Sequence, residues 1–304
     1  EHADIMRPGY AIEYDFSDPT QLKDSLETGL LHGLFFAGQI NGTTGYEEAG
    51  AQGLMAGINA ALHASGDAPI VLRRDQAYIG VMIDDLVTRG IGGEPYRMFT
   101  SRAEYRLLLR EDNADRRLSP IGEHLGLIES AAGERIRTKT SKVAAEIARL
   151  KSTLVPLGNK IDDYLINAGS SPLKESVHAF ELLRRPEVSY GAVLNLAGLA
   201  PTLDHDEAAE LEIDVKYEGY VRRQAEAVER LKRLEDVAIP EWVDYNGVGG
   251  LSTEVRERLA RIRPRSLGQA SRMPGVTPAA VSILAVHLRA RSGRAWIQRD
   301  QGSE

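Results

Sequence analysis

The alternation of hydrophobic and polar positions near the N-terminus predicts a strand, a loop and a helix in succession. Residues 34–37 (LFFA) form an apolar run bounded by glycines, which is typical of a strand buried on both faces. Residues 41–45 (NGTTG) are small and turn-forming. From Glu47 to about Ser65, small and apolar residues recur at helical spacing. With a second expected strand at residues 10–16, this stretch indicates one edge of an α/β domain.

One face of the expected helix is nearly bare, because Gly50, Gly53 and Gly57 fall at i, i+3 and i+7. Glycine costs about 1 kcal/mol relative to alanine at a helix position, so we expect something to lie very close to this face. Tight packing of the helix on a sheet is one explanation. The other is a flat or anionic ligand at the loop and the helix N-terminus, where free N–H groups and the helix dipole favour negative charge. The two explanations are compatible.

Downstream of this stretch the spacing of apolar residues is almost wholly helical. A helix over residues 75–87 should end at Gly90, and Ser119 with Pro120 suits a helix start. Further helices are expected at residues 131–150, in short pieces within 159–183, and at 189–199, 211–236, 252–262, 266–272 and 278–291. The last two resemble a helix-hairpin-helix with Thr277 as N-cap, which either holds a phosphate or forms a packing corner that docks another protein.

The composition is that of an ordinary soluble protein, with 42% hydrophobic and 27% charged residues. We find no apolar run of the roughly 18 residues that a membrane span needs, and no signal-peptide pattern. Cysteine is absent, which excludes disulfides, thiolate nucleophiles and cysteine-type zinc sites within this chain. A reducing cytosolic setting is compatible with this composition, and we expect a cytoplasmic protein without membrane contact. The chain begins at Glu1 and not at Met, so we also expect it to be a fragment.

Charge is distributed unevenly along the chain. Residues 251–299 hold ten Arg against two Glu, a balance of +8, and because the whole chain carries −7 the remainder carries −15. A basic module on an acidic body suggests contact with nucleic acid or with an acidic partner. A solvated charged face is the alternative for any single helix.

Arginine and tyrosine are interleaved between residues 96 and 110. Arginine is suited to phosphate contact and to stacking on bases, and tyrosine offers a stacking face, so this segment fits an RNA surface or the rim of an anionic cofactor. Nearby acidic residues allow an internal salt-bridge network instead. The candidate RNA-binding residues are Arg97, Arg102, Tyr105, Arg106 and Arg110.

The common motifs of nucleotide-binding proteins, hydrolases and metalloproteases are missing. The sequence has no G-x-G-x-x-G after a strand, no Walker A loop, no G-x-S-x-G and no H-E-x-x-H. The run Asp204–Glu207 contains a histidine among acidic residues, but acidic residues at a helix start have a dipole reason to be there, and no metal site is expected. The sequence does not identify a catalytic base or nucleophile.

Several long blocks match the signatures of a known family. They are Arg7–Asp15 (RPGYAIEYD), Gly33–Ala49 (GLFFAGQINGTTGYEEA), Pro95–Arg106 (PYRMFTSRAEYR) and Val215–Tyr220 (VKYEGY), with shorter matches at Gly268–Arg272 and Gly275–Ala280. Together they resemble the tRNA uridine 5-carboxymethylaminomethyl modification flavoproteins (MnmG, also called GidA). The matches are spread over the whole chain, which is similar to the C-terminal half of such a protein.

This resemblance implies an α/β remnant of a glutathione-reductase-like FAD-binding domain followed by a mostly α-helical C-terminal domain. The expected parts are residues 1–118, the end of the FAD-binding domain with the Arg/Tyr-rich segment; residues 119–240, a helical domain; and residues 241–304, a small basic helical subdomain. The motif that binds the FAD pyrophosphate would lie outside this chain, so the chain alone is expected to be inactive.

The resemblance also implies an activity and its partners. Family members modify carbon five of the wobble uridine of tRNA with FAD as redox carrier, NADH as reductant and methylenetetrahydrofolate as one-carbon donor. They form homodimers and work with an MnmE-type GTPase that docks on the C-terminal helical region. The implied cofactor-binding residues are Gly38, Gln39, Asn41, Gly42, Thr43 and Thr44. A non-catalytic helical module that binds tRNA and protein is the alternative.

Overall fold

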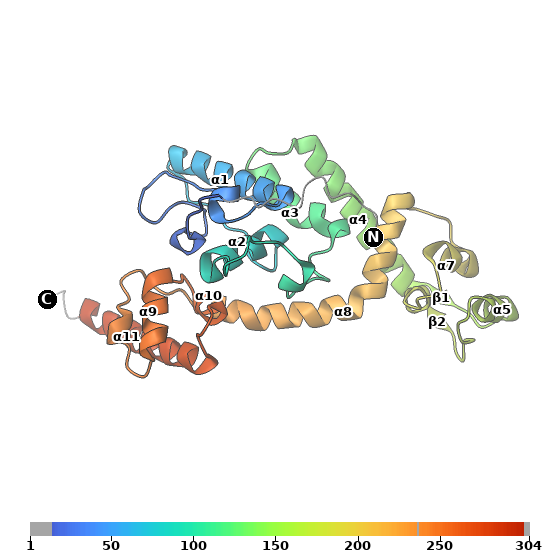
Figure 1. The fold of residues 1–304 in the computed structure, drawn as a ribbon. Coiled ribbons are helices and arrows are strands. Elements are labelled where there is room, and N and C mark those ends of the chain that lie inside the picture. Colours follow the sequence, from blue (N-terminus) through green and yellow to red (C-terminus); the bar gives the residue numbers. More distant parts are fainter. Residues whose placement is uncertain (1–13, 236, 301–304) are drawn as a thin grey trace, which may run out of the picture. The chain divides into compact units, whose positions relative to one another are not determined.

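The computed structural model describes residues 14–235 and 237–300, which form two compact, mostly helical units (Figure 1). The first unit comprises the described residues up to 74, residues 78–103 and those from 230 onward, and the second comprises residues 75–77 and 104–229. Among the described residues, no helix is both long and apolar enough to cross a membrane.

The first unit is built from five complete helices, with short 3-10 helices between them. The helices are α1 (Tyr46–Ser65), α2 (Tyr78–Arg89), α9 (Thr253–Ile262), α10 (Leu267–Arg272) and α11 (Pro278–Asp300), and the 3-10 helices are η1 (Pro19–Gln21), η2 (Gly38–Asn41), η3 (Thr100–Arg102) and η5 (Tyr245–Gly247). Four helices expected from the sequence are confirmed, at residues 75–87, 252–262, 266–272 and 278–291. Their ends differ by a few residues from the expected ones, except that α11 continues to Asp300.

The strand expected at residues 34–37 is wrong. Phe35 forms only an isolated antiparallel bridge with Glu27, and the side chain of Leu34 is 38% exposed. A strand buried on both faces needs neighbouring strands and helices to cover it, and the described residues supply one short extended neighbour. Of the strand expected at residues 10–16, residues 10–13 lie outside the described residues, and residues 14–16 are irregular.

Helix α1 is confirmed and buries one face, which consists of Gln52, Met55, Ala56 and Asn59. The opposite face contains the glycines at positions 50, 53 and 57, and a Cβ atom placed on any of them would meet nothing within 4 Å. The close neighbour that we expected on this face is therefore not found among the described residues.

Helix α2 is buried along almost its whole length, from Gly80 to Thr88. A Cβ atom on Gly80 would collide with the carbonyl oxygens of Leu72 and Arg73, so glycine is required where the incoming chain crosses the helix. Since α2 packs against α1 and against α10, it is the central element of the first unit.

Residues 239–288 enclose a hydrophobic core of their own. Three side-chain caps start its helices: Ser252 for α9, Ser266 for α10 and Thr277 for α11. The core residues include Ile239, Val243, Val248, Leu251, Leu259, Leu267, Met273 and Leu284. We expected residues 241–304 to be a separate subdomain, whereas contacts group this region with α1 and α2 in one unit.

The second unit carries the only sheet that the described residues form. Strands β1 (Leu154–Val155) and β2 (Val177–His178) pair antiparallel. The helices around them are α3 (Ala114–His124), α4 (Ser130–Ser152), α5 (Asn159–Asn167), α6 (Ala179–Leu183), α7 (Tyr190–Ala197) and most of α8 (His205–Glu235), with the 3-10 helix η4 (Glu111–Asn113) before α3. A core of leucine, valine and aromatic side chains between Val143 and Val215 joins them.

Two helix starts in this unit differ from expectation. Helix α3 begins at Ala114, so Pro120 lies inside it and not at its first turn. Helix α8 begins at His205, where Asp204 and Glu207 each accept a hydrogen bond from the other's backbone N–H, at 2.9 and 3.0 Å. This reciprocal cap explains the acidic run at this position. Among the described residues, no group of His, Asp and Glu side chains has the arrangement of a metal site.

Candidate functional site

The loop between residues 38 and 45 is organised by one buried side chain, Gln52 of α1. The Gln52 Oε1 atom accepts hydrogen bonds from the backbone N–H of Gly38 at 2.8 Å and from the Asn41 Nδ2 atom at 3.0 Å. Its Nε2 atom donates to the Thr43 Oγ1 atom at 2.9 Å and lies 3.8 Å from the sulfur of Met82 in α2. Because Gln52, Asn41 and Thr43 are almost fully buried, these bonds fix the loop to both helices.

Two glycines give the loop its tight shape. Gly38 and Gly42 have φ values of 77° and 68°, in the left-handed region that favours glycine. A Cβ atom on Gly42 would also lie 2.8 Å from the Cδ1 atom of Ile91. Any other residue at position 42 would therefore meet both backbone strain and a steric clash.

The segment around Tyr96 and Met98 is tied to this loop and to the start of α1. The Tyr96 N–H donates to the Gly42 carbonyl oxygen at 2.9 Å, and the Met98 N–H donates to Glu48 Oε1 at 3.0 Å. The hydrogen bond from Met98 lowers the pKa of Glu48 despite partial burial, with a smaller contribution from Arg97, whose Nη1 atom lies 3.8 Å from the carboxylate. Gly45 leaves the space in which this carboxylate and guanidinium lie.

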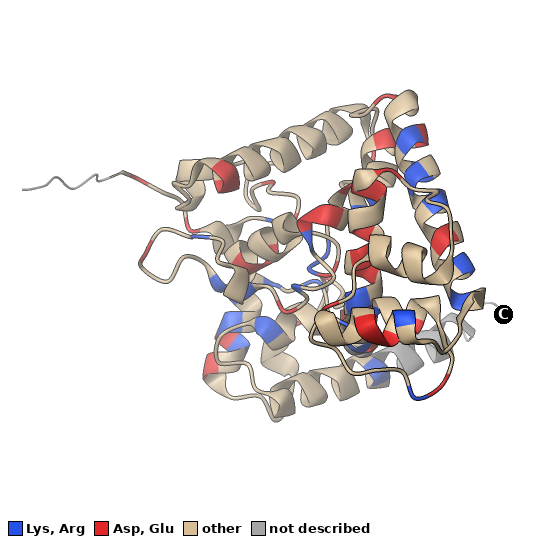
Figure 2. Cartoon of the chain, turned by 90° about the vertical axis from the view of Figure 1, so that its right-hand side faces the viewer, with Lys and Arg blue, Asp and Glu red and all other residues tan. Residues whose placement is uncertain are grey.

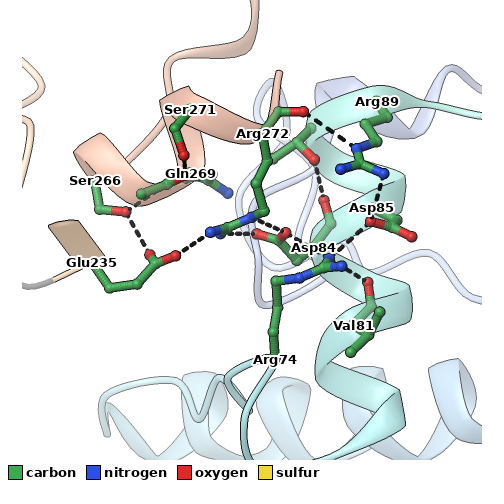
Figure 3. Close-up of polar contacts among 12 residues, drawn as sticks. Arg74, Val81, Asp84, Asp85, Arg89, Glu235, Ser266, Gln269, Ser271 and Arg272 are labelled. Carbon is green, nitrogen blue, oxygen red and sulfur yellow. Dashed lines mark hydrogen bonds and ion pairs between the residues drawn. The ribbon is translucent and has the colours of Figure 1, made fainter. Parts of the chain in front are cut away.

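A buried cluster of charged side chains joins α2 to α10, and Figure 3 shows Arg272 of α10 pointing toward Asp84 of α2. The Arg272 Nε and Nη2 atoms lie 2.7 and 2.8 Å from the two Asp84 carboxylate oxygens. A further ion pair connects Arg272 with Glu235. Burial opposes the charge on Arg272, but the two carboxylates outweigh it and raise the pKa of the guanidinium.

The neighbouring Asp85 is surrounded by cationic and phenolic groups. Arg74 lies 2.8 Å from Asp85 and 2.9 Å from Asp84, and the Tyr96 hydroxyl donates to Asp85 at 3.1 Å. Burial and the Asp85 carboxylate raise the pKa of Tyr96 well above its usual value, so the phenol stays protonated. The Arg102 guanidinium lies over the Tyr96 ring at 4.6 Å. Helix α2 thus contacts the loop through Met82 and the C-terminal helices through Asp84.

Three family models match successive parts of the chain. The model described as glucose inhibited division protein A matches residues 1–68. The model of the MnmG/GidA C-terminal helical domain matches residues 131–225, and the model of the MnmG/GidA C-terminal helical bundle matches residues 227–304.

Two curated relatives bear the name tRNA uridine 5-carboxymethylaminomethyl modification enzyme MnmG. The protein from Caldicellulosiruptor saccharolyticus is 52% identical over 288 residues, and that from Syntrophotalea carbinolica is 54% identical over 290 residues. In both cases the match covers 95% of this chain and 46% of the relative. The chain belongs to the MnmG/GidA family.

The solved structures agree with this assignment. The form II crystal structure of Aquifex aeolicus GidA has a TM-score of 0.80 and 42% identity, with coverage of 90% of this chain and 43% of that chain. The form I crystal structure of the same protein gives a TM-score of 0.78 at the same identity. The chain spans about half the length of the curated MnmG relatives it matches.

The six residues that the resemblance to MnmG implies for cofactor binding fall into two groups. Asn41 and Thr43 point into the network around Gln52, and Gly38 and Gly42 shape the backbone, so these four act from inside the loop. Gln39 and Thr44 are exposed, and neither side chain has a hydrogen-bond partner among the described residues. The N-cap of α1, Gly45, has no side chain to occupy the helix N-terminus. The exposed amide of Gln39 and hydroxyl of Thr44 fit one side of a polar, flat ligand such as FAD, whereas the space beside Gly45 at the start of α1 holds the Glu48 carboxylate.

The five candidate RNA-binding residues are also placed differently from one another. The Arg97 side chain is 54% exposed, and the Arg102 guanidinium contacts the Tyr96 ring and lies 3.9 Å from Asp85. Arg106 is exposed and has no ion-pair partner in the described part of the chain. Tyr105 is only 8% exposed, which leaves its ring no free face for a base. Arg110 lies 2.7 Å from Asp214 and 2.9 Å from Asp112. For Arg110 the structure favours the internal salt-bridge network that the sequence left open.

Charges of both signs alternate along the helices of the second unit (Figure 2). Arg116 pairs with Glu210 at 2.8 Å and with Asp214 at 2.8 Å, and Lys139 pairs with Glu210 at 2.9 Å. Arg116, which follows the Arg/Tyr segment, therefore holds α3 against α8, whereas Arg117 bonds to Asn113 and to the Arg110 carbonyl oxygen.

Sequence analysis did not find Gln52, Glu48 or Asp84. Gln52 could have been found, because it lies at i, i+3, i+4 and i+7 spacing with Met55, Ala56 and Asn59, which marks it as a polar residue on the buried face of α1. The partners of Glu48 and Asp84 are distant in sequence, and no local pattern indicates them.

Proposed function

We propose that this chain is the C-terminal part of an FAD-dependent tRNA-modifying enzyme. The complete enzyme would add a carboxymethylaminomethyl or aminomethyl group at carbon five of the wobble uridine. The proposal rests on one observation: two relatives named for this activity are more than half identical to this chain along 95% of its length. The catalytic base and nucleophile are left unassigned.

In this proposal the loop around Gln39 lies against FAD, which supplies the redox chemistry when bound. The Gln39 amide donates a hydrogen bond to the pyrophosphate or the ribityl chain, which a carboxylate at this position would repel. Thr44 and the start of α1 would lie beside the isoalloxazine, where the helix end would favour negative charge on the bound flavin. Gln52 keeps these groups in place by fixing Asn41 and Thr43. NADH serves as the reductant and methylenetetrahydrofolate as the one-carbon donor.

The proposal also includes partners. The exposed arginines Arg97, Arg102 and Arg106 contact tRNA phosphates, whereas Tyr105 and Arg110 support the segment from within. An MnmE-type GTPase docks on the C-terminal helices, and the complete protein is a cytoplasmic homodimer. What supports the docking surface is the presence of exposed apolar side chains on the module of residues 239–288, namely Trp242 at 60% and Val286 at 67% exposure.

Deletion of the gene that encodes this chain tests the activity. Mass spectrometry of nucleosides from the tRNA of the deletion strain should show loss of the modified wobble uridine, and re-expression of the gene should restore it. An unchanged nucleoside profile after deletion would contradict the proposal.

The flavin assignment has its own test. Gln39→Ala should lower the FAD retained by the purified complete protein, while Gln21→Ala, another exposed glutamine in the same unit, should leave it unchanged. If the complete protein retains no FAD at all, the alternative of a non-catalytic tRNA and protein-binding helical module is favoured.

A further inference from the structure

The block Val215–Tyr220 of α8 contains two tyrosines that the packing of the second unit does not use. Val215 is buried in the core of this unit, and the Lys216 ammonium donates to a backbone carbonyl oxygen at 3.1 Å. Tyr217 and Tyr220 are instead 42% and 55% exposed. Neither hydroxyl has a hydrogen-bond partner among the described residues. These two side chains are therefore available to a partner.

The two tyrosines form one surface together with an arginine. Their ring centroids are 6.4 Å apart, and the ring planes are inclined by 54°. The Arg223 guanidinium lies over the Tyr220 ring at 4.8 Å from its centroid. Arg223 is exposed and has no ion-pair partner in the part of the chain that the structure describes. Exposed aromatic rings beside an unpaired guanidinium are the groups that stack on bases and bind phosphates.

The end of the Arg/Tyr segment runs along the same side of α8. Gln224 accepts hydrogen bonds from the N–H groups of residues 107–108 at 3.1 and 3.2 Å, and Asp214 accepts one from Arg110 at 2.7 Å. Positions 214 and 224 are separated by about 15 Å of helix, and positions 217, 220 and 224 share one side because their spacing is i, i+3 and i+7. Arg106, which is exposed and unpaired among the described residues, directly precedes this tied segment.

The acidic residues of α8 near the rings are neutralised or point elsewhere. Asp214 is paired with two arginines, and Glu218 lies 3.9 Å from Lys151. Glu226 is unpaired among the described residues, but it comes nine positions after Tyr217 and so lies on the opposite side of the helix. Positive charge therefore prevails beside the rings on α8, which favours a phosphate-bearing partner over a neutral protein surface.

We propose that Tyr217 and Tyr220 form a stacking surface for an unpaired base of an RNA loop, with Arg223 and Arg106 on the adjacent phosphates. Bases in single-stranded loops expose their faces to aromatic rings, whereas the bases of a duplex are already stacked on each other. The surface thus recognises the loop and not the stem. This inference rests on the proposed function, in which the substrate is a tRNA.

The test is fluorescence anisotropy of the complete protein with a labelled RNA stem-loop of anticodon-arm sequence, and with a fully paired RNA of the same stem. Tyr217→Ala and Tyr220→Ala should each weaken stem-loop binding by at least about fivefold and leave duplex binding unchanged. Tyr220→Phe keeps the ring and should bind like the unchanged protein. The control is Ile166→Ala, at a 58% exposed apolar residue of the same unit, which should have no effect.

A salt series separates stacking from phosphate contact. The two tyrosine-to-alanine variants should keep the slope of log affinity against log salt, whereas Arg223→Ala should lower it by about 1. Melting temperatures show that each variant is folded. Unchanged stem-loop affinity of both folded tyrosine-to-alanine variants, or an equal loss for stem-loop and duplex, would overturn the stacking surface and leave the proposed function standing.

Two further outcomes are decisive. If the tyrosine-to-alanine variants keep RNA binding but lose association with the GTPase partner, the surface is a protein-docking site and the proposal is overturned. If the unchanged complete protein binds neither RNA, the proposed function fails together with this inference.

Discussion

The guanidinium of Arg272 and the carboxylate of Asp84 meet in a two-pronged ion pair, at 2.7 and 2.8 Å, although 188 positions separate them in the sequence. The pair joins the C-terminal helices to α2 within the first unit (Figure 3). Both side chains are largely buried, at 18% and 10% exposure. Each partner has one further ion pair, Asp84 with Arg74 and Arg272 with Glu235, so removal of Asp84 takes a carboxylate away from two buried guanidinium groups.

Asp84→Asn should therefore lower the free energy of unfolding, by at most about 3 kcal/mol, because Arg272 and Arg74 each lose one buried carboxylate and keep only Glu235 and Asp85. Urea denaturation measures this difference. Glu254→Gln removes one partner of the exposed pair Glu254–Arg258 and should change stability by less than about 0.5 kcal/mol. Equal losses in the two variants would show that the buried pair has no special role.

Glu48 should make stability depend on pH. Its pKa is lowered in the folded protein, first by the Met98 N–H, from an ordinary value of 4.5. A lowered pKa contributes stability above the unfolded value, and this contribution is lost as pH falls through the folded pKa. Glu48→Gln should consequently destabilise the protein at neutral pH, and the difference should shrink as pH falls below 4.5. A difference that stays constant over this range in urea titrations would contradict the assignment.

Gln52→Ala should release the flavin loop. The substitution leaves the Gly38 N–H and the Thr43 hydroxyl buried without their partner, at a cost of about 1–3 kcal/mol for each unsatisfied group. We expect lower stability and faster loss of FAD from the complete protein, measured by flavin absorbance after gel filtration. Gln21→Ala is the control. Full flavin retention in Gln52→Ala would mean that the loop holds its shape without this side chain.

Arg106→Ala should weaken tRNA binding and lower the slope of log affinity against log salt by about 1, as expected for one lost phosphate contact. Arg135→Ala, an exposed and unpaired arginine of α4 in the same unit, provides the matched control. Filter binding over a series of salt concentrations measures both slopes. An identical slope for Arg106→Ala and the unchanged protein would remove Arg106 from the tRNA surface.

Trp242→Ala should weaken association with the GTPase partner by about tenfold or more, since exposed tryptophans are frequent hot spots of protein interfaces. Leu157→Ala, at a 52% exposed residue of the second unit, should have no effect. Surface plasmon resonance with the complete protein would measure both. Undiminished binding by Trp242→Ala would place the docking surface elsewhere.

Local patterns in the sequence predicted most helices correctly. Helix α1 follows from the spacing of small and apolar residues after Glu47, and α11 follows from Thr277 as N-cap with Pro278 at the first position. The strand at residues 34–37 failed because the burial of a strand depends on neighbours that its own residues do not specify. The start of α3 was predicted wrongly because proline usually stands in the first turn of a helix, whereas Pro120 lies inside α3, where it removes one backbone hydrogen bond.

The candidate site was less predictable than the fold. Small, turn-forming residues predicted the loop and the family resemblance implied a flavin beside it, but neither separated exposed Gln39 from buried Asn41. That distinction depends on Gln52, which lies on a different element. For the same reason the sequence could not show which arginines of the Arg/Tyr segment form internal salt bridges. The partner of Arg110 is Asp214, more than a hundred positions away.

The reach of a single amide determines how long the flavin loop can be. Gln52 contacts the loop at its first residue, Gly38, and again at Thr43, and it also contacts Met82. Insertion or deletion of one residue between those two positions would move one contact out of range while the other stayed in place. Natural variation in chain length should therefore be rare between residues 38 and 43, even where the side chains of Gln39 and Ile40 change.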